Sequence, residues 1–330
     1  MLLWGAAAVA AVVLGLVWFV PANDYLYVPN AANPVADKVK VEGEKPSPPG
    51  AGGIYYVDVN VRRATWAEQL LPFLRPEGSS LVPKHQVVPP GTSFEDRRAD
   101  GLREMARSEE VAAAVALKQA GYDVPAIPRG ALVEAVAIDA PAAAELDVGD
   151  VIVAARGRPI RTPEQLRRSF TDVRPGDDVV LRVRGSGRIR SVTVRTVESP
   201  NEKGRAIIGI RVAQAADIRL PRKVDIDLGR VGGPSAGLPF ALDILQELGT
   251  DVDRGRRVVA TGEIALDGAI GPIGGVKQKT FGARKAGADV FLVPAGENAA
   301  EARRYAGKLR IIPVTTFQQA LSALRTLPAK

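Results

Sequence analysis

The first twenty residues of the chain carry no charged side chain, and they read MLLWGAAAVAAVVLGLVWFV. At about 1.5 Å of rise per residue, a helix of this length just crosses a hydrocarbon core about 30 Å thick. Trp4 and Trp18 lie near its two ends, where indole rings favour the membrane interface. We therefore expect an uncleaved, single-pass transmembrane anchor at residues 1–20, with the rest of the chain on one side of the membrane. A cleaved signal peptide is the alternative, although no clean A-x-A site precedes Pro21.

The pattern of the chain changes after this segment. Residues 21–53 are rich in Pro, Gly, Asn and Lys without a sustained period, which predicts a linker of extended or turn character. Apolar alternation predicts a strand at 54–61, and a helical pattern follows at 65–74. Three prolines predict a loop at 81–93. A broad apolar face predicts a helix at 99–120.

Between residues 127 and 197 the sequence consists of short apolar runs separated by turn residues. We expect strands at residues 131–133, 151–153, 179–183 and 192–194. Thr162-Pro163-Glu164 is a typical helix start and predicts a helix to Phe170. These elements predict a small, partly open barrel with one or two helices.

A serine in a glycine-rich segment is the first candidate for chemistry. Ser235 lies in Gly232-Gly233-Pro234-Ser235-Ala236-Gly237, directly before an apolar helical pattern. Small neighbours let a substrate backbone approach the hydroxyl closely, and a helix entrance offers N–H groups that would stabilise an oxyanion. The alternative is an ordinary helix N-terminus with a proline in its first turn.

A serine nucleophile needs a base, and the chain offers few candidates. It contains no cysteine, and its one histidine, His85, lies in a Pro-rich stretch that predicts a solvent-facing loop. Lysine is the remaining candidate, provided that burial lowers its pKa from about 10.4. Lys277 and Lys279 follow the apolar, glycine-rich run Gly268–Val276, and Thr261 could hold the amine in position. Spacing alone does not decide between the two lysines.

Together these segments resemble the proteolytic domain of Lon proteases. Pro234-Ser235-Ala236-Gly237 matches the nucleophile motif, while Thr261-Gly262-Glu263 and residues 272–279 match the region of the base. The resemblance implies that Ser235 is the nucleophile and Lys279 the base, and that the supporting residues are Thr261, Gly233, Pro234 and Ala236. Gly232 stands where classical ATP-dependent members carry an acidic residue, as in the ATP-independent Lon-like branch. No G-x-x-x-x-G-K-[ST] phosphate-binding loop occurs in the sequence.

Residues 127–198 resemble a bacterial PDZ domain of the kind attached to extracytoplasmic proteases. The matching residues are 129–133, 140–143 and 146–152. In such domains a loop before the first strand binds a chain-terminal carboxylate, and a neighbouring strand edge pairs with the peptide. The resemblance implies that this loop is Gly130, Ala131 and Leu132. The alternative is a barrel whose groove is blocked or contacts only its own chain.

The resemblance to membrane-anchored, PDZ-containing Lon-like proteins implies an α+β fold and a domain order. The Lon-type proteolytic domain, of the ribosomal protein S5 domain 2-like fold, would comprise residues 54–125 and 204–330, with Val224–Leu228 as the strand leading to Ser235. The PDZ domain at 127–198 would be inserted into it. Three consecutive domains are the alternative.

The predicted function is that of an ATP-independent serine endopeptidase at the cell membrane, with its soluble part extracytoplasmic. Its partners would be protein or peptide substrates and the membrane, and related domains imply a homo-oligomeric ring, commonly of six. No cofactor, nucleotide or metal is expected. The net charge of +7 is spread among acidic residues, so nucleic acid is not an expected partner. An inactive membrane-anchored scaffold that binds peptides is the alternative function.

Overall fold

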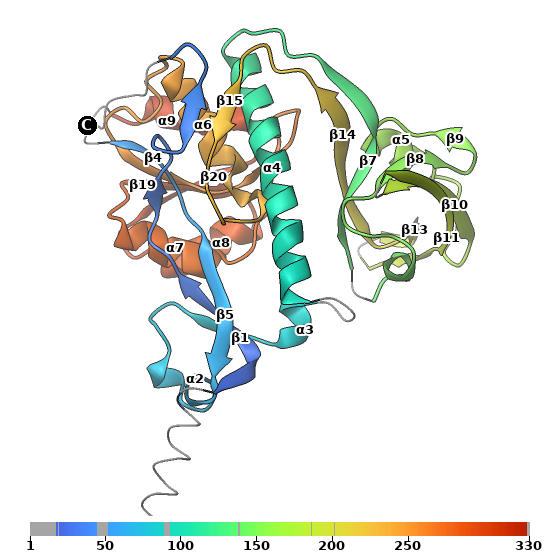
Figure 1. The fold of residues 1–330 in the computed structure, drawn as a ribbon, viewed down its shortest axis with the longest axis horizontal. Helices are drawn as coiled ribbons and strands as arrows, with labels where there is room; N and C mark the ends of the chain where they lie inside the picture. Colours follow the sequence, from blue (N-terminus) through green and yellow to red (C-terminus); the bar gives the residue numbers. More distant parts are fainter. Residues whose placement is uncertain are drawn as a thin grey trace, which may run out of the picture. The chain divides into compact units, whose positions relative to one another are not determined.

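The chain folds into two compact units. Both units contain helices and strands, and this mixed composition is the one that the sequence predicts. In this computed structural model, unit 1 comprises Met1–Gly121 and Arg222–Lys330, and unit 2 comprises Tyr122–Pro221. Figure 1 shows the elements of both units. The structure describes residue 18 and residues 20–44, 52–88, 93–137, 139–185, 187–200 and 202–328.

The largest sheet of unit 1 has five strands in the order β2-β4-β16-β19-β20. All neighbours are parallel except β2, which pairs antiparallel with β4 at the edge. Every residue of β19 is buried, as is typical of a parallel strand that is covered on both faces. The bounds are β2 (Asn33–Pro34), β4 (Gly53–Tyr56), β16 (Arg257–Ala260), β19 (Val290–Pro294) and β20 (Arg310–Val314).

Helices provide the crossover connections that parallel strands require. Helix α7 lies between β16 and β19 in the chain, and α8 lies between β19 and β20. Helix α6 is buried along all of its length except Gln246, and it packs against α4 and β4. The bounds are α4 (Phe94–Gln119), α6 (Gly237–Glu247), α7 (Val276–Lys285), α8 (Glu297–Tyr305) and α9 (Phe317–Thr326).

The linker predicted at 21–53 is wrong for its described part. Strand β1 is the central strand of a second sheet, in the order β5-β1-β6, and β3 pairs with β15. Leu26 and Val35 are completely buried. The Pro and Asn residues around Tyr25-Leu26-Tyr27-Val28 obscured a run of strong strand formers. The bounds are β1 (Pro21–Pro29), β3 (Val39–Val41), β5 (Val59–Thr65), β6 (Ser80–Val82), β15 (Val224–Ile226), β17 (Glu263–Ile264) and β18 (Ile270–Gly271).

Three further expectations in unit 1 need smaller corrections. The strand predicted at 54–61 is divided between β4 and β5, and the helix predicted at 65–74 is α2 (Trp66–Leu70) followed by the 3-10 turn η1 (Pro72–Leu74). The predicted loop at 81–93 contains part of β6 and the short helix α3 (Lys84–Val87). Helix α4 begins earlier than expected because Ser93 and Asp96 form a capping box at its start.

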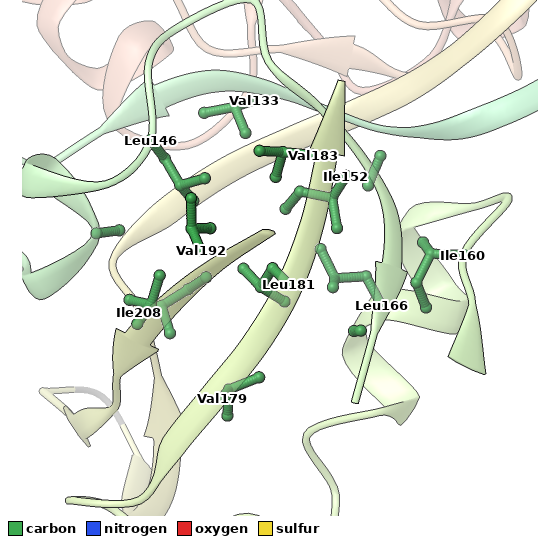
Figure 2. Packing of buried hydrophobic residues seen from close by; sticks show 14 of the residues in the cluster. Val133, Leu146, Ile152, Ile160, Leu166, Val179, Leu181, Val183, Val192 and Ile208 are labelled. Carbon is green, nitrogen blue, oxygen red and sulfur yellow. The ribbon is translucent and has the colours of Figure 1, made fainter. Parts of the chain in front are cut away.

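Unit 2 is a sheet in the order β11-β10-β8-β7-β14, with β9 paired to β8 and a separate β12–β13 hairpin. Figure 2 shows its core, in which Ile152, Leu181 and Val183 are completely buried. Burial alternates along β10, so one face of the sheet covers this core. The bounds are β7 (Ala126–Val136), η2 (Pro141–Ala144), β8 (Val151–Ala155), β9 (Arg158–Pro159), α5 (Pro163–Arg168), β10 (Asp178–Gly185), β11 (Arg188–Arg195), β12 (Val197–Ser199), β13 (Glu202–Ile207) and β14 (Ile210–Ile218).

The anchor predicted at residues 1–20 lies almost wholly outside the described residues. Within the part of the chain that the structure describes, no helix combines the length and the apolar character that a bilayer crossing requires.

Candidate active site

Ser235 lies in a single 3-10 turn, η3 (Pro234–Ala236), directly before α6. Gly233 precedes the turn with a φ of 93°, a conformation that favours glycine. Gly237 follows it, and a Cβ atom there would lie 2.7 Å from a methyl carbon of Ile264. The two glycines around Ser235 are therefore needed for the backbone path and for close packing.

Contacts from distant parts of unit 1 hold this turn. The Ser108 hydroxyl, on α4, donates a hydrogen bond of 2.9 Å to the Pro234 carbonyl. The Gly233 N–H donates to the Gly101 carbonyl at 2.7 Å, so it is occupied and does not face a substrate. The Gly262 N–H donates to the Ser235 carbonyl at 2.8 Å. The backbone around the serine is thus fixed from α4 and from the segment after β16.

Lys279, in the first turn of α7, reaches the serine hydroxyl. Its Nζ atom lies 2.7 Å from Ser235 Oγ and 3.1 Å from Thr261 Oγ1. Thr261 follows the carboxyl end of β16 and is completely buried, and its hydroxyl donates to the Ser235 carbonyl at 3.1 Å. The Thr261 oxygen can therefore accept an N–H of the amine while the nitrogen lone pair faces Ser235.

The electrostatic surroundings favour a neutral amine. Lys279 is only 4% exposed, and its burial lowers its pKa to about 7. The Asp58 carboxylate acts in the opposite direction and limits the fall. At neutral pH a large fraction of Lys279 can accept a proton.

The neighbouring lysine has a different environment. Lys277 Nζ donates to the Ser79 carbonyl at 2.9 Å and lies 5.6 Å from the ring centroid of Tyr305. It joins α7 to the segment before β6, away from the Ser235 hydroxyl. The structure therefore brings Lys279, and not Lys277, to the serine.

The residues predicted as a carboxylate-binding loop in unit 2 lie elsewhere. Gly130, Ala131 and Leu132 are inside strand β7, so the predicted loop position is wrong. Strand β14 pairs with β7 along its length, and β8 pairs with Ala131 and Leu132 on the other side. The Gly130 N–H donates to the Arg161 carbonyl at 3.2 Å. The sequence did not reveal that these residues lie in a paired strand, because their partner strand, β14, comes from a distant part of the chain.

Sequence reasoning missed Ser108 and Gly101 of α4. Ser108 is 5% exposed, three residues after the buried Met105 and three before the buried Val111. A polar residue on the apolar face of a predicted helix was the available signal. His85 is exposed on α3, and the described part of the chain holds no cluster of three acidic, His or Cys residues suited to a metal ion.

Two family models match the chain. Residues 227–326 match the Lon protease (S16) C-terminal proteolytic domain, and residues 91–196 match the PDZ domain. Both parts of the expected resemblance are therefore found. Ser235, Thr261 and Lys279 lie inside the first match. The second match begins before α4, a helix that belongs to unit 1.

Similar proteins include two Lon proteases. Lon protease 1 of Sorangium cellulosum is 35% identical over 137 residues, which cover 37% of this chain and 16% of the relative. Lon protease of Chloroflexus aggregans is 32% identical over 165 residues, which cover 45% of this chain and 20% of the relative. The chain thus spans a fifth or less of the length of these relatives. Among solved structures, the PDZ domain of an SdrC-like protein from Listeria monocytogenes is 22% identical and covers 26% of this chain and 87% of that chain, with a TM-score of 0.24.

Proposed function

We propose that this chain is a serine endopeptidase in which Ser235 is the nucleophile and Lys279 is the general base. The observation that carries the proposal is the distance of 2.7 Å between Lys279 Nζ and Ser235 Oγ. A serine hydroxyl is a weak nucleophile until a base removes its proton, and a base works best when its pKa lies near the working pH. The pKa of about 7 for Lys279 meets that condition.

The proposed reaction follows from these contacts. The neutral Lys279 amine takes the Ser235 proton as Oγ attacks the carbonyl carbon of the scissile peptide bond. Thr261 orients the amine through the 3.1 Å contact. The positive end of α6 lies directly after the serine and would stabilise the negative charge on the carbonyl oxygen. The Lys279 ammonium then gives its proton to the leaving amine, and water hydrolyses the acyl-enzyme.

Covalent labelling tests the nucleophile directly. A fluorophosphonate probe should modify the folded protein at a single residue, and mass spectrometry should locate the adduct on Ser235. The Ser235→Ala protein should remain unlabelled and should not cleave peptides. A folded protein that resists the probe, or one modified elsewhere, would favour the inactive peptide-binding scaffold over the protease.

The pH dependence of cleavage should report the lysine. Only the neutral amine accepts the serine proton, so kcat/KM should rise with pH and level off above an apparent pKa of about 7. Below that value the rate should fall about tenfold per pH unit. A profile that keeps rising toward the pKa of an exposed lysine, about 10.4, would contradict the assignment.

We also propose that cleavage is ATP-independent and acts on exposed segments of secreted or membrane proteins. The absence of a phosphate-binding loop from these 330 residues supports the first point. The uncharged segment at 1–20 supports membrane anchoring of a single-pass protein. The resemblance of residues 127–198 to PDZ domains of extracytoplasmic proteases supports an extracytoplasmic soluble part. Assembly into a homo-oligomeric ring is proposed from the resemblance to Lon-like proteins.

A further inference from the structure

A small pocket opens in unit 1 between α4 and the segment that leads to the nucleophile. Its volume is about 220 Å³. This is less than the 300 Å³ or more of typical small-molecule pockets, and it suits a single amino-acid side chain. Its walls include Leu102, Met105 and Glu109 from α4, and Asp227, Leu228 and Val231 from the facing segment.

The two walls of the pocket belong to α4 and to the segment before Ser235, and α4 also holds the Ser235 turn in place. On α4, Met105 lies between Gly101 and Ser108, the two residues that hydrogen-bond to the backbone of Gly233 and Pro234. On the other side, Val231 is four residues before Ser235 in the same segment. The pocket is therefore bounded by the same helix and the same segment that hold Ser235 in place.

Two carboxylates, Glu109 and Asp227, give the pocket a negative charge, and Asp227 accepts a hydrogen bond of 2.9 Å from the Gly229 N–H. Glu109 is partly buried, and its pKa is raised by that burial and by the nearby Asp227 carboxylate. Among the described residues, no cation pairs with Glu109. By contrast, Glu104 on the same helix lies 3.9 Å from Arg97. Within the described ranges of the chain, these two neighbouring carboxylates beside apolar walls thus form a site without a paired side-chain cation.

We infer that this pocket is a substrate subsite for a lysine or arginine side chain. The aliphatic stem would pack on Leu102, Met105 and Val231, and the cationic end would meet Glu109 and Asp227. A neutral apolar side chain would fill the space without pairing the carboxylates, and an acidic one would be repelled. The inference rests on the proposed protease function, because it assigns a substrate preference to that same site.

Internally quenched peptides test the preference. The set keeps one scaffold and places Lys, Arg, Met or Glu in turn at each position around the cleaved bond. At one position, Lys and Arg should give a kcat/KM at least about tenfold above Met, and Glu should be the poorest, because a charged hydrogen bond is formed or lost. Glu109→Gln should lower the Lys-to-Met ratio about 10- to 100-fold.

The matched control is Glu110→Gln, which removes the adjacent carboxylate of the same helix, one that does not line the pocket. It should leave the Lys-to-Met ratio within about twofold of the wild type, since a charge in contact with solvent is well screened. Thermal unfolding of both variants shows whether they are folded. The same loss of selectivity in both variants would overturn the inference, as would the absence of any position that prefers a cation.

Peptide-binding measurements distinguish a failure of the inferred subsite from a failure of the proposed protease function. The Ser235→Ala protein should bind the best Lys peptide more tightly than its Met counterpart in calorimetry, and adding Glu109→Gln should abolish the difference. If the wild type binds with this preference but cleaves nothing, the protease proposal fails, while the pocket keeps its role in binding a cationic side chain. If it cleaves the Lys and Met peptides equally well, the protease stands and the subsite is refuted.

Discussion

Replacing Lys279 by alanine should lower kcat/KM by about two to four orders of magnitude, while Lys277→Ala should change it less than about threefold. Loss of a positioned general base costs about 10² to 10⁴ in rate. Lys279 Nζ contacts Ser235 Oγ, whereas Lys277 Nζ contacts the Ser79 carbonyl. Steady-state cleavage of one fluorogenic peptide by both variants measures the difference.

The two lysines are close to an ideal control pair, because they lie two residues apart on α7. Lys277→Ala should cost only stability, about 1 kcal/mol for its lost hydrogen bond. In addition, the Ser235→Ala/Lys279→Ala double variant should be no slower than either single variant, since the two residues act as one unit. Equal losses at positions 277 and 279 would rule out the assignment of the base.

Replacing Asp243 by asparagine should stabilise the protein at neutral pH by about 2–4 kcal/mol. Asp243 lies in the middle of α6 and is completely buried, and neither of its carboxyl oxygens has a hydrogen-bond partner among the residues that the structure describes. Burial, with a smaller contribution from the nearby Glu247, Asp253 and Asp37, raises its pKa to about 8. An aspartate in the unfolded chain has a pKa of about 3.9, so keeping this one protonated at pH 7 costs about 4 kcal/mol.

The stability of the protein should depend on pH because the Asp243 carboxyl group has a higher pKa in the folded protein than in the unfolded chain. Between pH 4 and 8 the folded protein holds a proton that the unfolded chain releases, so the free energy of unfolding falls as pH rises. The slope is up to about 1.4 kcal/mol per pH unit and vanishes above the folded pKa of about 8. An asparagine side chain is neutral at every pH, so the Asp243→Asn protein should lose this slope and match the wild type near pH 4.

Urea unfolding at several pH values from 4 to 7.5 measures both effects. Asp253→Asn is the control with the opposite expected sign, because the Asp253 carboxylate accepts hydrogen bonds from the Gln246 side chain and the Gly255 N–H. A less stable Asp243→Asn protein with an unchanged pH slope would show that the carboxyl group is solvated in solution.

The local sequence predicted the members of the candidate site but only part of its environment. Ser235, Thr261 and Lys279 were identified from short motifs, and the structure brings them together. Spacing could not choose between Lys277 and Lys279, because that choice depends on which face of α7 is buried. Ser108 lies far before Ser235 in the chain, and its role depends on how α4 packs.

In the fold, too, the elements that depend on local sequence patterns were predicted, and those that depend on distant partner strands were not. Helices with strong apolar periodicity, such as α6, lie where the sequence predicts them. Strand β1 was missed because its pairing with β5 and β6, rather than its own composition, makes it a strand. The position of Gly130 was misjudged for the same reason, since β14 is supplied from a distant part of the chain.

Because β14 already pairs with β7, a peptide that binds unit 2 by pairing with β7 has to compete with β14. Nine residues of β14 run antiparallel along β7, and β14 also contacts α5. Because it belongs to the same chain, β14 is present beside β7 at an effective concentration of millimolar order or above. A free peptide tail that pairs with β7 must displace this tethered strand. On the outer sides of β14 and β11 no described strand is paired, so a peptide that adds there displaces none of them.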